Sequence, residues 1–490
     1  MNDRLDPRLG QSASPPADAA SIITRMEKTF AGQRAAFAVD MDPSREARRD
    51  SLSRVLALTE KHQDAIADAI SADFGHRSRH ETDLAEIFIV LSAVRHMRRH
   101  LGRWMRPRRV ATPLHMQPAR SELIPQPLGV VGVISPWNYP YQLGMVPAAA
   151  ALAAGNRVML KPSELTPRFS ELLQEIVAEF FAVEEFAVIP GDVEVGRAFS
   201  KLPFDHLLFT GSTAVGKQIA LAAAENLTPV TLELGGKSPA IIDIDCDIAV
   251  AAPRIAYGKL LNAGQTCIAP DYVLVPRARV DEFVAETQQA VTAMYPSLAA
   301  NPDYTSIVND RHRDRLTRLV EDAKAQGATV IRIAPTGEQP AALGRKMPAT
   351  LLVGVDDDMA VMREEIFGPV LPILAYDTPD DAIAYVNRHP RPLALYWFGD
   401  DKTRRDQVLH STISGGVTVN DTCWHFAQEN LPFGGVGASG MGAYHGEQGF
   451  RTFSKDKPVF HQTGVNAFGL FRPPYGRPFE TLVALLKRYF

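Results

Sequence analysis

Short apolar runs alternate with helical patterns through the middle of the chain. The runs that predict buried strands are VVGVIS (130–135), RVMLK (157–161), DHLLFT (205–210) and PVTLEL (229–234). Between them, Pro147 and Pro167 are predicted to begin two helices, and residues 211–224 to open as a turn and continue as a third. Strands that alternate with helices favour βαβ units and a parallel sheet. We therefore expect an α/β fold.

Helical and extended patterns flank this region. Apolar positions recur at helical spacing in 45–74 and again in 83–105. Residues 110–128, which prolines punctuate, predict hairpin strands, and KPVFHQ (457–462) predicts a further strand. From Gly236 to about residue 440 the alternation continues less regularly, which predicts a second α/β domain.

Composition narrows the class of protein. The 490 residues are 46% hydrophobic and 22% charged, as expected of a globular chain with a sizeable core. The net charge of −4 gives no basic excess that would hold a nucleic-acid backbone. Cys246, Cys267 and Cys423 are too few cysteines for a disulfide framework and suit a reducing compartment. We see no signal peptide and no apolar run long enough to span a membrane, so we expect a cytoplasmic protein.

Two residues suggest a nucleophile with a general base. Cys267 lies in NAGQTCIAPD, on a predicted loop between a helix that ends near Asn262 and a strand that begins near Asp271. Glu233 lies at the end of the PVTLEL strand run, at the edge where parallel sheets bind ligands. Taken alone, Cys267 is best interpreted as a small buried apolar residue. For Glu233 taken alone, half of an ion pair and a functional carboxylate fit about equally well. Together they fit a thiolate nucleophile with a carboxylate base.

Polar residues also follow the other predicted strands. Ser212 lies in GSTAVGKQ, a near P-loop in which Gln218 replaces the hydroxyl residue, and helix-start amides of this kind can hold a phosphate. Glu164, close to Lys161 in KPSE, can accept hydrogen bonds from ribose hydroxyls. Asn138 in SPWNYP offers an amide donor suited to an oxyanion hole. For each of these segments an ordinary polar turn is the alternative interpretation.

In combination these segments resemble the aldehyde dehydrogenase superfamily. The matching segments are LELGGKSP, NAGQTCIAPD, SPWNYP, KPSE, FTGSTAVG, EEIFGPV and LPFGGVGASG, and they occur in the order expected of that family. The resemblance covers roughly residues 25–460. CIAPDYVLVP and FGGVGASGMGAYHGEQGFRTFS are most similar to the class 3 branch, and the bacterial coniferyl-aldehyde dehydrogenases are the nearest subgroup.

The resemblance implies oxidation of an aldehyde to a carboxylic acid with NAD, or with NADP. Cys267 would form a thiohemiacetal and then a thioester, with Asn138 as an oxyanion donor and Glu233 as the base for hydrolysis. The residues implied for cofactor binding are Lys161, Glu164, Gly211, Ser212, Glu365 and Phe367. The candidate residues of the substrate pocket are Tyr139, Cys423, His425 and Phe433. We expect no metal, and an aromatic coniferyl-type aldehyde as substrate, with medium- or long-chain aliphatic aldehydes as the alternative.

The family fold implies three parts and a tail. Residues 1–110 and 129–235 would form a Rossmann-type dinucleotide-binding domain, and 236–440 an α/β catalytic domain. Residues 111–128 and 455–470 would form a small β oligomerisation arm. A tail helix is expected in 471–490. Exposed strand edges in the arm would be covered by a second copy, so we expect a homodimer.

Three other classes compete with this interpretation. A nucleoside triphosphatase could use GSTAVGKQ, although that segment lacks the P-loop hydroxyl and leaves Cys267 and Glu233 without a role. A cysteine hydrolase would pair Cys267 with a histidine, and none lies near it in the sequence. A catalytically silent relative would not need every catalytic residue type that is present.

Overall fold

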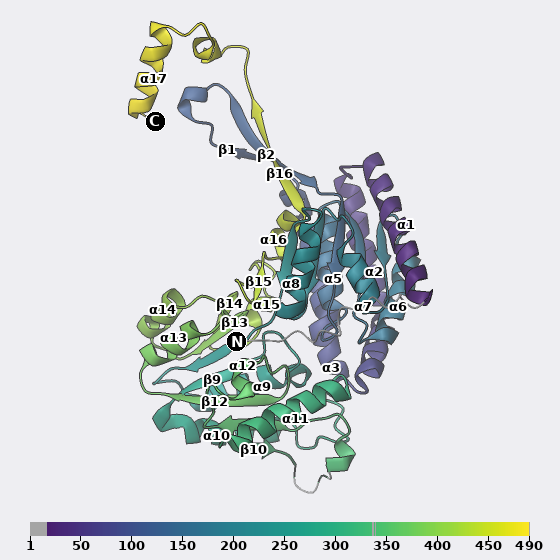
Figure 1. Ribbon diagram of the computed structural model, residues 1–490, viewed down its shortest axis with the longest axis vertical. Coiled ribbons are helices and arrows are strands. Elements are labelled where there is room, and N and C mark those ends of the chain that lie inside the picture. Colours follow the sequence, from purple (N-terminus) through teal and green to yellow (C-terminus); the bar gives the residue numbers. More distant parts are fainter. Residues whose placement is uncertain (1–16, 336–337, 339, 490) are drawn as a thin grey trace.

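The computed structural model describes residues 17–335, 338 and 340–489, and its strands form three sheets (Figure 1). The first sheet has six strands in the order β15-β7-β6-β3-β4-β5. Their bounds are β3 Val130–Ile134, β4 Arg157–Lys161, β5 Phe186–Val188, β6 His206–Thr210, β7 Val230–Glu233 and β15 Gly440–Met441. All neighbours in this sheet are parallel except β15, which is antiparallel to β7. The four predicted strands and the parallel α/β class are confirmed.

Helices pack around the six-stranded sheet (Figure 1). They are α1 Ala17–Val39, α2 Arg45–Phe74, α3 Arg79–Thr82, the π-helix η2 Asp83–Phe88, α4 Ile89–Trp104, α5 Gln142–Ala153, α6 Pro167–Phe180, α7 Val193–Ser200, α8 Thr213–Ala224 and α16 Gly446–Thr452. The predicted helix over 45–74 is confirmed as α2, and it packs against α4, α5 and α6. Residues 1–20, whose richness in Pro, Ala, Ser and Asp predicts an N-terminal tail, fall mostly outside the described residues.

The start of α5 corrects one expectation. Pro147 was expected to begin this helix, but α5 begins at Gln142 and contains Pro147 in its interior. The proline has no N–H, so the carbonyl of Leu143 loses its usual helical partner. All residues of α5 are buried, and this apolar burial offsets the lost hydrogen bond. Pro167 does begin α6 as predicted.

The second sheet has seven strands in the order β10-β11-β12-β9-β8-β13-β14. Their bounds are β8 Pro239–Ile242, β9 Tyr272–Pro276, β10 Thr329–Ile333, β11 Ala349–Val353, β12 Val370–Tyr376, β13 Ala394–Phe398 and β14 Gly416–Val419. Its helices are α9 Ile248–Leu260, α10 Val280–Met294, α11 Asp310–Ala325, α12 Ala360–Arg363, α13 Pro379–Arg388, α14 Lys402–Ser411 and α15 Trp424–Ala427, with short 3₁₀ turns η4 Leu261–Gly264, η5 Arg277–Arg279 and η6 Pro340–Leu343. Only β10 runs antiparallel to its neighbour, so the region after Gly236 is a second α/β unit.

A three-stranded antiparallel sheet projects from the body as an arm (Figure 1). Its strands are β1 Arg108–Val110, β2 Arg120–Pro127 and β16 Ser454–His461, and the 3₁₀ turn η3 Leu114–Met116 lies between β1 and β2. β1 falls inside the 1–110 segment that was expected in the dinucleotide-binding domain, so the arm begins earlier than predicted. The turn η7 Ala467–Phe471 and helix α17 Arg477–Tyr489 follow β16 at the far end of the arm. None of the helices in the described part of the chain is both long enough and apolar enough to cross a membrane.

Candidate active site

The candidate site lies between the six-stranded and the seven-stranded units, because both contribute residues to its lining. In the six-stranded sheet the parallel strands β3, β4, β6 and β7 end at one edge. The strand ends and the loops that follow them carry Asn138, Lys161, Glu164, Gly211, Ser212 and Glu233. In the seven-stranded sheet, neighbouring parallel strands β9 and β12 begin just after Cys267 and after Glu365 and Phe367, respectively. Ligands of open α/β sheets bind at the carboxyl edge of the strands.

A cleft of about 240 Å³ brings most of the predicted site residues together. Its lining includes Asn138, Gly211, Ser212, Glu233, Cys267, Glu365 and Phe367. Lys161, Glu164 and the four candidate pocket residues lie outside this lining. The nucleophile, the base and the oxyanion donor expected from sequence therefore share one cavity.

The loop that carries Cys267 is held in an unusual backbone conformation. The φ values of Asn262, Ala263 and Gly264 are 55°, 52° and 76°. They lie in the left-handed region, which is unfavourable for residues other than glycine. The buried Gln265 side chain fixes the loop, because its Nε2 donates to the Asn262 carbonyl at 2.9 Å and to the Ser306 carbonyl at 3.0 Å. The cysteine is thus presented by a rigid turn.

The Cys267 thiol is partly accessible from the cleft, yet its pKa is raised. Burial in its surroundings is the main cause, and the nearby carboxylates of Glu365 and Glu233 add to it, since negative charge disfavours a thiolate. The backbone N–H of Cys267 itself is directed at the sulfur and opposes this increase. Among the described residues, no hydrogen bond joins Cys267 to a histidine, so the pairing expected of a cysteine hydrolase is not observed.

Glu233 is a buried carboxylate with no hydrogen-bond partner for either oxygen among the residues described. Burial alone raises its pKa well above the usual range. Buried polar atoms almost always have partners, so an unpartnered carboxylate in a cleft needs a functional explanation. A carboxylate that acts as a general base needs free oxygens to accept a proton from a ligand or from water, and Glu233 has them.

Asn138 is buried beside the cysteine loop. Its Nδ2 donates to the carbonyl of Gln265 at 3.1 Å. An amide nitrogen carries two hydrogens, and this bond uses one of them. The second hydrogen is available to an oxygen that binds in the cleft near Cys267.

The cofactor side of the cleft fits a dinucleotide. Glu365 Oε1 and Thr210 Oγ1 are buried with no partner in the described structure, so they can hydrogen-bond to hydroxyls of a bound ligand. Gly235 leaves room for this carboxylate, because a Cβ there would collide with Glu365. Ser212 caps α8 by accepting from Val215 N, and this helix start faces the cleft, where a pyrophosphate is favoured.

Lys161 and Glu164 lie at the end of β4, beyond the cleft lining. The Lys161 Nζ donates to the Pro162 carbonyl at 2.7 Å and lies 3.8 Å from Glu164 Oε2. The side chain of Glu164 is 41% exposed, whereas that of Lys161 is 3% exposed. Burial lowers the pKa of Lys161, and the Glu164 charge opposes this change. The exposed carboxylate can therefore reach a ligand that extends from the cleft over β4.

Two of the four candidate pocket residues, Tyr139 and Cys423, lie close to the residues that flank Cys267. The Tyr139 hydroxyl shares a 2.8 Å hydrogen bond with Thr266 Oγ1, and Cys423 Sγ lies 4.0 Å from the Ile268 carbonyl. The rings of His425 and Phe433 stack with centroids 6.2 Å apart. Tyr139, His425 and Phe433 are all buried. Their assignment to the substrate pocket stays a prediction.

Two lining residues had no signal in the sequence. His312 and Arg315 come from α11 and reach the cleft from the seven-stranded unit. The His312 ring packs against Trp137 with centroids 5.1 Å apart, and Arg315 donates to the carbonyls of Glu365 and Ile366. α11 is a polar helix. The sequence pattern therefore does not distinguish His312 and Arg315 from the solvent-exposed polar residues beside them.

We expect alkylation of Cys267 by iodoacetamide to accelerate as the pH rises above neutral, because only the thiolate reacts and the thiol pKa is raised. In Glu233→Gln a neighbouring negative charge is lost, so the pKa of Cys267 falls and the acceleration moves to lower pH. Mass spectrometry of the Cys267 peptide measures this rate separately from Cys246 and Cys423. If alkylation of Glu233→Gln accelerated at the same pH as in the unchanged protein, or at a higher pH, Glu233 would not raise the pKa of Cys267.

Comparison with known proteins agrees with this geometry. The chain is 52% identical to the coniferyl aldehyde dehydrogenase of Pseudomonas sp. strain HR199, over 95% of each chain. It is 41% identical to aldehyde dehydrogenase family 3 member A2 of Mus musculus, over 88% of each. These matches confirm the predicted likeness to class 3 enzymes and to coniferyl-aldehyde dehydrogenases.

Solved structures match over nearly the whole chain. The substrate-bound AldH of Staphylococcus aureus has a TM-score of 0.89 and 38% identity, and the match covers 94% of this chain and 99% of that one. Aldehyde dehydrogenase C of Pseudomonas syringae, in complex with NAD+ and octanal, has a TM-score of 0.81 and 30% identity, over 91% of this chain and 90% of that one. The model of the aldehyde dehydrogenase family matches residues 14–459. The chain therefore belongs to the aldehyde dehydrogenase family.

Proposed function

We propose that this aldehyde dehydrogenase oxidises a coniferyl-type aromatic aldehyde with NAD, using Cys267 as the nucleophile. The observation that carries the proposal is that Cys267, the unpartnered Glu233 and Asn138 line one cleft. The substrate class is supported by the coniferyl aldehyde dehydrogenase relative. Membership of the aldehyde dehydrogenase family favours aldehyde oxidation over nucleoside triphosphate hydrolysis. A cytoplasmic location is part of the proposal, because all three cysteines are free thiols.

In the first half of the reaction the Cys267 thiolate adds to the aldehyde carbon. A C–S bond forms and the carbonyl electron pair moves onto oxygen. The free Nδ2 hydrogen of Asn138 and the backbone N–H of Cys267 stabilise this oxyanion, as donors in an oxyanion hole do. The carbon held by Cys267 then loses a hydride and becomes the carbonyl carbon of a thioester. NAD, when bound, would supply the oxidant that takes up this hydride.

In the second half Glu233 hydrolyses the thioester. Its carboxylate takes a proton from a water molecule, and the hydroxide adds to the thioester carbonyl. The C–S bond then breaks, so the carboxylic acid leaves and the Cys267 thiolate is restored. The raised pKa of Glu233 makes its ionised form a stronger base than a carboxylate in water.

The cofactor would lie across the carboxyl edge of the six-stranded sheet. Ser212 and the start of α8 would hold the pyrophosphate, with Gly211 allowing close approach, and Glu365 the nicotinamide ribose. Phe367 would pack near the nicotinamide ring. At the far end, Lys161 and Glu164 would hold the adenine ribose. NAD is preferred over NADP in this proposal, because a 2′-phosphate would place negative charge beside Glu164.

A panel of aldehydes tests the proposed substrate class. We expect kcat/KM for coniferaldehyde to exceed that for long-chain aliphatic aldehydes by about tenfold or more, because three of the four candidate pocket residues, Tyr139, His425 and Phe433, are aromatic and aromatic rings pack well on one another. Benzaldehyde serves as the control for the ring without its propenal side chain. A higher kcat/KM for aliphatic aldehydes would favour the fatty-aldehyde alternative, for which the octanal complex of the P. syringae enzyme is the supporting observation.

We expect the protein to be a homodimer through its arm. The arm sheet has exposed edges, and Phe460 on β16 is 48% exposed, so a second copy would cover strand edge and apolar surface together. Light scattering should give twice the chain mass of 53.7 kDa. Phe460→Asp should shift the mass toward one chain on dilution. One-chain mass for the unchanged protein at micromolar concentration would contradict the arm's role.

A further inference from the structure

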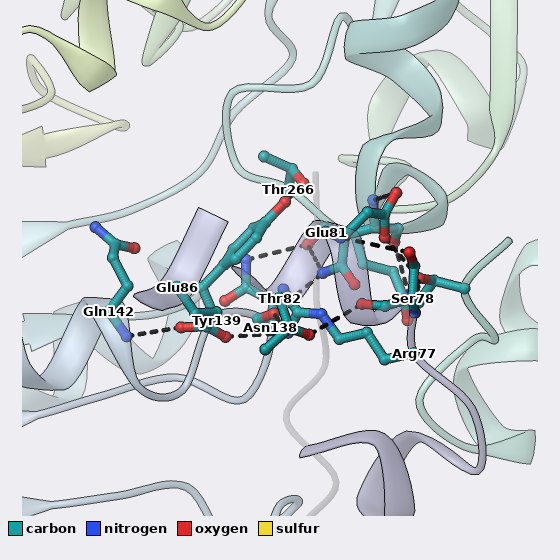
Figure 2. Close-up of polar contacts among 12 residues, drawn as sticks. Arg77, Ser78, Glu81, Thr82, Glu86, Asn138, Tyr139, Gln142 and Thr266 are labelled. Atoms are coloured by element: carbon teal, nitrogen blue, oxygen red, sulfur yellow. Dashed lines mark hydrogen bonds and ion pairs between the residues drawn. The ribbon is translucent and has the colours of Figure 1, made fainter. Parts of the chain in front are cut away.

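A buried ion pair contacts the loop that carries Asn138 (Figure 2). The Arg77 Nη1 donates to Glu86 Oε1 at 3.1 Å and to the backbone carbonyl of Asn138 at 2.8 Å. The side chains of Arg77 and Glu86 are both fully buried. Neither residue is part of the cleft lining.

Glu86 holds the other end of the same loop. Its Oε2 accepts from the N–H of Gln142 at 2.7 Å, and it also receives a hydrogen bond from the Tyr141 backbone. Gln142 is the first residue of α5. Arg77 and Glu86 therefore fix both the Asn138 peptide and the start of the helix that follows it, and Figure 2 shows both contacts. Glu86 comes from η2, a π-helical turn, and such turns are frequent at functional sites.

The Asn138 peptide is also tied to the cysteine loop. Asn262 Nδ2 donates to the Asn138 carbonyl at 3.0 Å and to the Gln265 carbonyl at 3.2 Å. The Asn138 carbonyl thus receives donors from Arg77 and Asn262, which uses both of its lone pairs. Glu81 accepts from the backbone N–H of Asn262 at 3.1 Å. The carbonyl of Asn138 and the turn before Cys267 are parts of one hydrogen-bonded unit.

Stability is a weak explanation for this pair. The free-energy cost of desolvating two buried charges offsets most of their electrostatic attraction. Apolar residues of similar volume therefore often stabilise a fold as well as a buried ion pair does, or better. Moreover, Arg77 Nε and Nη2 have no partner in the described structure, so the guanidinium is incompletely satisfied. What the charges do provide is a fixed direction for the Asn138 carbonyl, since Nη1 of Arg77 is held by Glu86.

We propose that Arg77 and Glu86 are positioning residues that set the Asn138 amide against the oxygen of the Cys267 adduct. The inference rests on the proposed function, in which Asn138 stabilises that oxyanion. The pair acts through the peptide of Asn138: a shift of this peptide moves the Nδ2 donor away from the adduct. Formation of the adduct should then slow, while NAD binding and the reactivity of the free thiol stay intact.

Stopped-flow measurement of the first NADH formed per enzyme tests the proposal. Arg77→Met keeps an unbranched, though shorter, side chain and removes the charge and the hydrogen bonds to Glu86 and to the Asn138 carbonyl. We expect the burst rate to fall by about 10- to 100-fold, less than the ~10²- to 10³-fold typical for loss of a whole oxyanion donor. Arg77→Lys restores a charged donor and should recover about tenfold of that loss. The Kd for NAD and the iodoacetamide rate at Cys267 should stay within about twofold.

Two further variants keep the result interpretable. Glu86→Gln keeps the shape and an acceptor for Gln142, so it carries the test where Arg77→Met does not fold, and it should slow the burst similarly. Asp243→Asn is the matched control, because Asp243 is a buried partner of Arg404 at 2.8 Å outside the cleft lining. Its burst rate should equal that of the unchanged enzyme.

Asn138→Ala separates the two levels of inference. If it slows the burst while Arg77→Met, Arg77→Lys and Glu86→Gln all keep the unchanged rate, the positioning role is refuted and the proposed mechanism stands. If Asn138→Ala itself keeps the unchanged rate, the oxyanion role is refuted, and the positioning role with it. A fall in NAD affinity that matches the fall in burst rate would also overturn the positioning role, because it would indicate general damage to the cleft.

Discussion

The Cys267→Ala variant is expected to lose aldehyde oxidation, with kcat lower by on the order of 10⁴-fold or more, because without the thiolate no covalent adduct can form. NADH absorbance with coniferaldehyde and saturating NAD measures the loss. Alanine is only slightly smaller than cysteine, and Cys267 makes no hydrogen bond through its side chain to another described residue, so the cleft should keep its shape. Calorimetry should therefore give a Kd for NAD within about twofold of the unchanged enzyme.

Cys246→Ala is the matched control for this experiment. Cys246 is also a buried thiol, but it does not line the cleft, and burial raises its pKa to about 12. Its removal should leave kcat within about twofold. Full steady-state activity in Cys267→Ala would exclude the covalent mechanism altogether.

The Glu233→Gln variant is expected to stop after one turnover. Glutamine has the shape of glutamate but cannot accept the proton of the attacking water, so kcat should fall by about 10²- to 10⁴-fold. A burst of NADH close to one per enzyme should remain, because the thioester still forms. Rapid mixing with excess aldehyde and NAD resolves the two phases.

An added nucleophile supplies the control for this second result. Hydroxylamine attacks thioesters without help from a base, so it should restore part of the turnover in Glu233→Gln and release a hydroxamate. Loss of the burst itself would point to a different role, in which Glu233 takes the proton of the Cys267 thiol. That outcome would keep the nucleophile and move the base to the first half of the reaction.

The strand pattern predicted much of the site because the chemistry lies where strands end. Glu233 ends β7 and Gly211 follows β6, and both strands are apolar runs that a period-two or fully buried pattern identifies. Parallel pairing then brings these ends to one edge without further information. That Cys267, from the loop before β9, lies at this edge was predicted only from the family resemblance. No local sequence pattern shows how the two α/β units are placed relative to each other.

Charged residues that contact the cleft or its supporting loops from outside the sheets could not be predicted in this way. His312 and Arg315 lie among charged neighbours on α11, and Arg77 and Glu86 lie among other charged residues before α4. From sequence alone such charges fit a solvated face, which is their usual place. Their burial depends on contacts far along the chain, such as that between Arg77 and the carbonyl of Asn138. The start of α5 was missed for a related reason: complete burial outweighed the local preference of Pro147.

The pairing of β15 with β7 has a consequence for synthesis of the protein on the ribosome. β15 comes more than 200 residues after β7, yet it closes the edge beside Glu233: Gly440 pairs with Glu233, and Leu234 N donates to the Ser439 carbonyl at 3.0 Å. Chains emerge from their N-terminus, so a nascent chain that has emerged only to about residue 430 holds the nucleophile and the base but leaves β7 as an open edge. The edge beside Glu233 can thus be closed only after the segment that holds β15 has been synthesised, which is more than 170 residues after Cys267. The thiol and its base therefore reach their finished geometry well after both have been synthesised.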